Sequence, residues 1–176
     1  FDGIQYNRIY IGLQGHGSMK ITDYISEYAN AIVSRAKRGK PIIIQAASNH
    51  VNGLAAVMAA RILGIKCIYE VRGLWEITRL SRQPKWAGSE QALLIEYLET
   101  EAAIRSDIVI TLNQAMKQKL ITRGVDEQNI HIVPNGVDSN RFKPLQRVSE
   151  IEVELELDDK VVIGYVGSIV DYEGLD

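Results

Sequence analysis

Two polar loops carry the side chains best suited to bind a ligand. The first, residues 47–53 (ASNHVNG), contains Ser48, Asn49 and His50 between an apolar run and a helix-like segment. Hydroxyl, amide and imidazole groups beside the free N–H groups of a helix N-terminus favour anions or hydroxyl-rich ligands. We therefore predict a ligand site in this loop. The alternative is that Ser48 or Asn52 merely caps the helix.

The second loop is residues 69–76 (YEVRGLWE), which follows the next strand-like run. Arg72 offers fixed N–H donors for a phosphate or carboxylate, and the ring of Trp75 can stack on a sugar. Glu76 lies beside them in sequence. These three residues are predicted to bind an acceptor or a sugar. The alternative is structural, with Arg72 paired to Glu70 and Trp75 in the core.

A third segment, residues 134–138 (PNGVD), follows the last strand-like run of the first domain. The pair Asn135–Gly136 is typical of a tight turn with positive φ, and Asp138 follows it. We predict that these three residues form a hinge or line a cleft.

Other polar or glycine-rich segments carry weaker signals. Glycines 12, 15 and 17 do not have the GxGxxG spacing of a dinucleotide site, so a flexible loop is predicted, from which His16 or Lys20 could still reach a ligand. There is no Walker loop and no nucleophile–base signature. Glutamates 96, 99 and 101 on a long helix-like segment are expected to form a solvated face.

Strand-like and helix-like segments alternate along the chain, with short loops between them. Strands are predicted at residues 8–13, 41–47, 67–71, 107–112 and 130–133, and helices at 24–38, 53–63, 89–105 and 114–123. The run at 41–47 is apolar throughout, which predicts a strand covered on both faces.

This alternation predicts an α/β domain, a Rossmann-like doubly wound sandwich with a mostly parallel sheet. Ligands in such sheets bind beyond the carboxyl ends of the strands, which is where the three loops lie. After this domain, residues 150–159 are predicted to form a short acidic helix, with Ser149 and Glu152 as a capping box. Residues 161–166 are predicted to form a buried strand that opens a second α/β unit.

Composition excludes several classes of function. The 176 residues carry a net charge of −2, which argues against binding nucleic acid through its phosphates. No apolar run approaches the roughly 20 residues of a membrane span. A single cysteine and three scattered histidines give no disulfide and no metal spacing. We expect a cytoplasmic protein without a metal or cofactor, cut from a longer chain at both ends.

Four segments follow one another in the order and spacing of a family 4 glycosyltransferase. They are residues 53–76, 99–124, 130–144 (IHIVPNGVDSNRFKP) and 161–176 (VVIGYVGSIVDYEGLD). The chain resembles that family from about residue 41 to residue 176. The resemblance implies the two-domain GT-B architecture, with residues 1–145 as a truncated acceptor-binding domain. Residues 146–176 would be a linker and the start of a nucleotide-sugar domain.

The resemblance also implies a reaction. The intact protein would transfer a sugar from a nucleotide-diphosphate donor to a glycan or lipid-linked acceptor of the cell envelope, with retention and without a metal. Cations and a helix N-terminus would stabilise the charge on the leaving diphosphate. The family's paired-glutamate donor motif would lie beyond residue 176. The chain alone would then hold half of the cleft and be inactive.

The resemblance places two groups of candidate residues. Arg72 occupies the position where the family often has a histidine before glycine, and a subgroup acting on lipid-linked or polysaccharide acceptors is similar at YEVR-LW. In the second domain, the loop of Gly167, Ser168 and Glu173 lacks the family's usual Arg and Lys. This departure argues against conventional diphosphate binding by that loop.

Two alternatives remain open from the sequence. A nucleotide-sugar 2-epimerase shares the two-domain shape and the donors, and would need no acceptor. A non-catalytic α/β ligand-binding module is consistent with Ser168 and Glu173. Peripheral contact with the inner face of the membrane is a further option. Self-association of the fragment is expected through the unpaired strand at 161–166.

Overall fold

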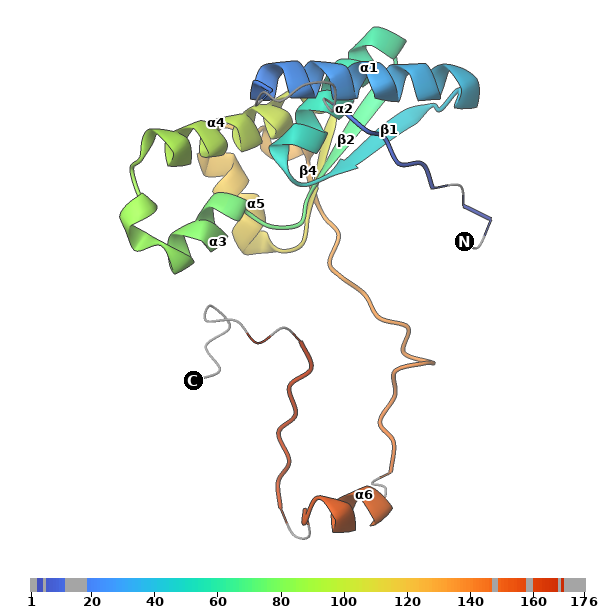
Figure 1. The fold of residues 1–176 in the computed structure, drawn as a ribbon, viewed down its shortest axis with the longest axis vertical. Helices are drawn as coiled ribbons and strands as arrows, with labels where there is room; N and C mark the ends of the chain where they lie inside the picture. The colour runs from blue at the N-terminus through green and yellow to red at the C-terminus, as the bar shows by residue number, and fades with distance from the viewer. Residues whose placement is uncertain are drawn as a thin grey trace. The chain divides into compact units, whose positions relative to one another are not determined.

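The computed structural model describes residues 3–4, 6–11, 19–146, 149–157, 160–167 and 169. Two compact units are present, Phe1–Pro134 and Asn135–Asp176, and each is described by itself. The first unit holds a sheet with helices packed on it (Figure 1).

The first unit is built on a four-stranded parallel sheet with the strand order β1-β2-β3-β4. Its strands are β1 (Ile43–Ala47), β2 (Lys66–Val71), β3 (Ile108–Thr111) and β4 (Ile130–Ile132). The predicted α/β class and parallel sheet are confirmed. The strand predicted at 8–13 is not, because residues 8–11 have no regular structure; residues 12 and 13 lie outside the described part.

Five α-helices flank the strands in sequence. They are α1 (Ile21–Gly39), α2 (His50–Leu63), α3 (Trp75–Arg82), α4 (Glu90–Arg105) and α5 (Gln114–Thr122), with 3₁₀ turns at Pro84–Trp86 and Glu127–Asn129. The helices predicted at 89–105 and 114–123 are confirmed, and Ser89 and Asn113 cap them by accepting bonds from the first turns of α4 and α5. The cap expected at Asn52 is wrong. Helix α2 begins three residues earlier and is capped by Asn49, because Asn52 donates to the Ala47 carbonyl instead.

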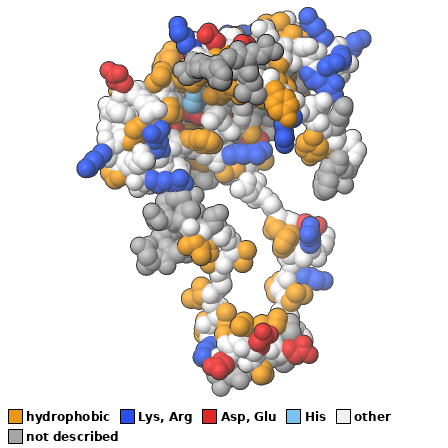
Figure 2. All heavy atoms as spheres, in the orientation of Figure 1, with side chains coloured by type: hydrophobic (Ala, Val, Ile, Leu, Met, Phe, Trp, Pro, Cys, Tyr) orange, Lys and Arg blue, Asp and Glu red, His pale blue; other side chains and the backbone are white. Residues whose placement is uncertain are grey.

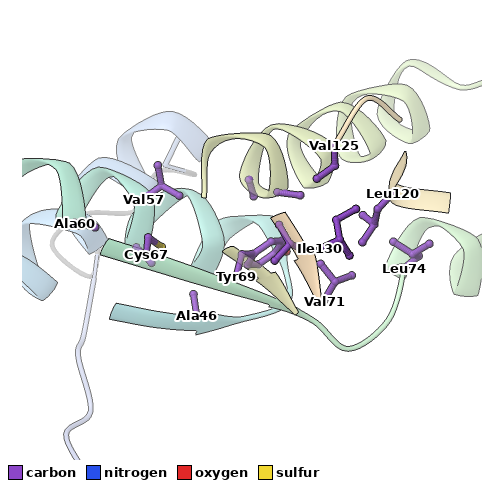
Figure 3. Close-up of a cluster of buried hydrophobic side chains, with 14 residues drawn as sticks. Ala46, Val57, Ala60, Cys67, Tyr69, Val71, Leu74, Leu120, Val125 and Ile130 are labelled. Atoms are coloured by element: carbon purple, nitrogen blue, oxygen red, sulfur yellow. The ribbon is translucent and has the colours of Figure 1, made fainter. Parts of the chain in front are cut away.

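Helices α2, α4 and α5 all pack on one face of the sheet. Each strand lies next to the one before it, so the chain moves across the sheet in one direction. Because the connections between parallel strands are right-handed, the helices that form them lie on the same face. Figure 3 shows the buried side chains of this interface, from β1 to β4 and from the covering helices: Ala46, Val57, Ala60, Cys67, Tyr69, Val71, Leu74, Leu120, Val125 and Ile130.

The opposite face of the sheet is only partly covered by the described residues. Ile43 and Gln45 of the outer strand β1 are exposed, and Ile68 and Ile110 are half-buried. The prediction that 41–47 is covered on both faces is therefore wrong for this part of the chain, since β1 is the edge strand of the described sheet.

Helix α1 packs on α2 rather than on the central strands. Ile25, Ala29 and Val33 form its buried stripe, against Ala55 and Ala59 of α2. Its last turn is basic, which complements the negative end of the helix dipole. Lys and Arg side chains gather around that end of the helix (Figure 2).

The second unit contains one described helix, α6 (Ser149–Glu154), whose acidic side chains are visible in Figure 2. A short helix is confirmed here, but it ends at Glu154, and residues 155–157 of the predicted range 150–159 are not helical. The buried strand predicted at 161–166 is wrong: these residues have no regular structure, and Val161 and Ile163 are each 93% exposed. A strand is stabilised by a ladder to a neighbouring strand, and the described part of this unit supplies none. Pairing with a second copy stays a prediction.

Candidate functional site

An open pocket of about 690 Å³ lies where β1 and β2 end. Its lining comes from the start of α2, from α3 and from one side of α4: Asn49, His50, Trp75, Glu76, Thr78, Arg79, Arg82, Gln83, Trp86, Ile95 and Glu99. Four of the six residues predicted to bind an acceptor or sugar are thus brought together: Asn49, His50, Trp75 and Glu76. Parallel sheets present both loops at this edge, because their strands end there.

Ser48 and Arg72, the other two, lie outside this lining. The Ser48 hydroxyl donates to the Glu70 carbonyl at 3.2 Å and accepts from the Arg72 backbone N–H at 2.9 Å. It therefore ties the ends of β1 and β2 together. The Arg72 guanidinium binds the Glu70 carboxylate at 2.9 and 3.0 Å, the ion pair that the structural alternative described.

Glu70 and Arg72 form an ion pair at the surface. Arg72 lowers the pKa of Glu70 through these hydrogen bonds, and Gln45 of β1 donates a further bond to the same carboxylate at 2.8 Å. Arg72 is exposed. Two of its N–H groups already donate to Glu70, so fewer are left to bind a ligand.

His50 is held in place by a buried carboxylate that the sequence did not identify. Glu99 Oε1 accepts from the His50 backbone N–H at 2.9 Å and lies 3.1 Å from its ring Nδ1. Glu99 Oε2 accepts from the Tyr69 hydroxyl at 2.6 Å. Burial, followed by the neighbouring Glu99 charge, raises the pKa of Tyr69, so the phenol keeps its proton and donates.

The prediction that Glu99 lies on a solvated face is wrong, since it is 3% exposed. The signal that could have placed it is helical spacing. Glu99 is seven residues after Ala92 and three before Ala102, and these alanines form the buried stripe of α4. Leu94, by contrast, is exposed.

Gly53 permits the close packing behind this network. A Cβ at Gly53 would lie 2.7 Å from the Tyr69 ring and 2.9 Å from the Ala102 Cβ. The first turn of α2 can therefore approach both β2 and α4. This approach brings His50 within reach of Glu99.

Glu76 forms the second buried carboxylate of the pocket. Its Oε1 lies 2.6 Å from Nη2 of Arg123, and both side chains are almost fully buried. Arg123 Nε lies 3.5 Å from a Glu96 oxygen. Within the described part of the chain, Glu76 Oε2 and Arg123 Nη1 have no hydrogen-bond partner. This pair is held mainly by charge.

The mouth of the pocket is aromatic and basic. Trp75 is 59% exposed, so the structural alternative that places it in the core is wrong. The buried tryptophan is Trp86 instead, whose Nε1 donates to Gln91 at 3.2 Å. The Arg79 guanidinium lies 4.4 Å from the Trp86 ring centre, a cation–π geometry.

The remaining predicted site residues lie in the second unit. Asn135 and Gly136 have no regular structure and no positive φ, so the tight turn predicted there is wrong. The turn comes later, where Asp138 Oδ1 accepts from the Asn140 N–H at 2.9 Å. Gly167 is an exposed bend. Ser168 and Glu173 lie outside the described residues, as do His16 and glycines 12, 15 and 17.

A second hollow, about 360 Å³, lies at the opposite edge of the sheet and contains none of the predicted site residues. Among the residues that the structure describes, no group of three or more His, Cys, Asp or Glu side chains could hold a metal ion. No helix in the described ranges is long and apolar enough to cross a bilayer.

The sequence model of Glycosyltransferase Family 4 matches residues 7–141. The chain belongs to Glycosyltransferase Family 4. The match covers both pocket loops, and it extends into the first residues of the second unit. Among curated proteins, none matches this chain.

The fold of this family 4 chain is similar to that of a solved structure. The Anabaena protein Alr3699/HepE, whose crystal structure contains UDP-glucose, is similar over 74% of this chain and 33% of its own, with a TM-score of 0.55 and 19% identity. A Listeria monocytogenes protein assigned as a UDP-N-acetylglucosamine 2-epimerase is similar over 64% of this chain and 27% of its own, at 18% identity and a TM-score of 0.46. This weaker likeness adds nothing to the assignment. The chain thus spans about a third of the length of the HepE structure.

Proposed function

We propose that the protein carrying this chain transfers a sugar from a nucleotide-diphosphate donor to a glycan or lipid-linked acceptor. The pocket beyond β1 and β2 is its acceptor site. Membership of Glycosyltransferase Family 4 supports the reaction class. The single observation that carries the site is the convergence of Asn49, His50, Trp75 and Glu76 on one pocket.

The pocket has the chemistry of a carbohydrate site. The exposed ring of Trp75 offers a flat apolar surface against the C–H face of a sugar, while the imidazole and amide beside it offer hydrogen bonds to hydroxyls. Arg79 and Arg82 also line the pocket, and their charge suits an acceptor that carries a phosphate or carboxylate. An acidic or phosphate-linked glycan acceptor fits this combination.

The donor is proposed to bind outside the described part of the chain, in a nucleotide-sugar domain that begins after the linker. Retention of the anomeric configuration and independence from a bound metal are part of the same proposal. Without a metal, the charge of the leaving diphosphate is stabilised by cationic side chains and a helix N-terminus. The 176-residue chain by itself is proposed to be inactive, because it supplies one side of the cleft.

The transferase proposal is tested with the intact protein. It is incubated with UDP-, GDP- and dTDP-sugars, with and without lipid-linked and glycan acceptors, and the released nucleotide is followed by mass spectrometry. We expect acceptor-dependent release of one nucleoside diphosphate, unchanged by EDTA. Conversion of a donor without any acceptor would assign an epimerase instead. No turnover of any donor would contradict the transferase and favour a ligand-binding module.

A further inference from the structure

His50 is the one imidazole that lines the described pocket, and its protonation pattern is determined by what it contacts inside the protein. Its ring Nδ1 and its backbone N–H both face the same oxygen of Glu99. His50 is 6% exposed, and Glu99 is more buried still. Water therefore competes poorly for these bonds.

An ionised carboxylate has no proton to donate, so the Glu99 oxygen can only accept, from the backbone N–H and from the ring alike. Nδ1 of His50 must then carry the proton. A neutral imidazole has one N–H, so Nε2 is left as an acceptor with a free lone pair. The Tyr69 hydroxyl donates to the other oxygen of Glu99, which leaves Oε1 for His50.

We propose that Glu99 is a positioning residue that holds His50 in the Nδ1-protonated form, so that Nε2 accepts a hydrogen bond from a hydroxyl group of the bound acceptor. The hydrogen bond from an acceptor hydroxyl to Nε2 rests on the proposed function. The Nδ1-protonated form of His50 does not. The other charged groups of the pocket are Glu76, which is paired with Arg123, and Arg79 and Arg82. The Glu99 carboxylate faces the His50 ring at 3.1 Å, and we assign the orientation of the ring to this contact.

The protonation pattern is read by NMR on the 176-residue chain labelled with ¹⁵N-histidine. Two-bond ¹H–¹⁵N correlations distinguish the two neutral forms of an imidazole, at about pH 8.5, where an ordinary histidine is neutral. The chain has three histidines, and the His50 signals are those that disappear in His50→Gln. We expect the Nδ1–H form. A dominant Nε2–H form in the unmodified chain would overturn the proposal without any variant.

Two variants separate positioning from mere packing. Glu99→Met removes the acceptor at nearly constant length, and the preference for Nδ1–H should then be lost. Tyr69→Phe is the matched control, since it removes a donor from the other oxygen and should leave the His50 pattern unchanged. An unchanged Nδ1–H form in Glu99→Met would show that Glu99 does not set it. If Glu99→Met fails to fold, the spectrum of the unmodified chain still decides.

The hydrogen bond to Nε2 is tested in the intact protein with the acceptor identified by the donor and acceptor panel. His50→Gln can place an amide oxygen near the former Nε2 position, so its KM for the acceptor should stay within a few-fold. His50→Leu has no acceptor atom and should raise that KM about tenfold. Equal KM values for the two variants would reject the hydroxyl contact. An intact protein without transferase activity would reject the proposed function and this contact, but not an observed Nδ1–H pattern.

Discussion

Glu76 and Glu99 are both buried carboxylates beside one pocket, but they are stabilised in different ways. Glu99 accepts bonds from two uncharged groups, the backbone N–H of His50 and the hydroxyl of Tyr69, and lies 3.1 Å from the His50 ring Nδ1. Glu76 is balanced by the charge of Arg123 and keeps one oxygen without a hydrogen-bond partner among the described residues. The Glu99 region orients a side chain toward the pocket. The Glu76 region ties α3 to the end of α5.

The two regions should respond differently to the loss of a partner. A buried ion pair leaves an uncompensated charge when one member is removed, whereas a carboxylate with several neutral donors loses only part of its solvation. Breaking the Glu76–Arg123 pair should therefore cost more stability than removing a partner from the Glu99 region.

The largest effect is expected from Arg123→Met. The Glu76 carboxylate then stays buried without its counter-charge, and the free energy of unfolding should fall by about 3–5 kcal/mol. The double variant Glu76→Met/Arg123→Met removes both charges and should recover most of this loss. Urea unfolding measures both. A double variant no more stable than Arg123→Met would show that packing, rather than charge balance, dominates this region.

A smaller loss is expected in the Glu99 region. Glu99→Met leaves the His50 N–H and the Tyr69 hydroxyl without their acceptor, which should cost about 2–4 kcal/mol of unfolding free energy. Tyr69→Phe removes a single bond to the carboxylate and should cost about 1–2 kcal/mol. Both are measured by the same urea unfolding. A Tyr69→Phe loss equal to that of Glu99→Met would mean that the His50 contact contributes nothing to stability.

The smallest effect concerns the exposed pair outside the pocket. Because Arg72 lowers the pKa of Glu70 in the folded chain, the stability from this pair is present above the unfolded value of about 4.3 and is lost as pH falls through the lower folded value. Glu70→Gln should therefore be slightly less stable at neutral pH. Its deficit should shrink as the medium becomes more acidic than the unfolded value. Arg72→Gln should show the same pH dependence, and a deficit that persists in acid would contradict the ion-pair explanation.

Much of the fold could be predicted from the sequence because its signals are local. Apolar runs of strand length, alternating with helix-like segments across short loops, were sufficient for β1 to β4, α4 and α5. The exposed chain at 161–166 could not be predicted in this way. A run such as VVIGYV has strand propensity wherever it stands, but a strand also needs a partner, and propensity does not show whether one is present.

The candidate site could be predicted only where the residues fall in loops. Asn49, His50, Trp75 and Glu76 follow strands, so the parallel topology alone places them at one edge. Glu99 and Arg123 lie within or beside helices far along the chain, and their roles come from tertiary contacts with α2 and α3. Arg72 was predicted to bind a ligand, but it lies outside the pocket lining. Its guanidinium binds Glu70, two residues earlier in the chain, and this local pair holds it beside the pocket.

The central claim is that the pocket beyond β1 and β2 binds the acceptor of a sugar transfer. The most direct measurement compares the KM for the acceptor in the intact protein, in Trp75→Ala and in Ile77→Ala. Both residues are exposed on α3, but only Trp75 lines the pocket, and neither change should alter the unfolding free energy greatly. We expect an increase of about tenfold or more for Trp75→Ala and less than about twofold for Ile77→Ala. Equal KM values for the two variants would show that the acceptor does not bind in this pocket.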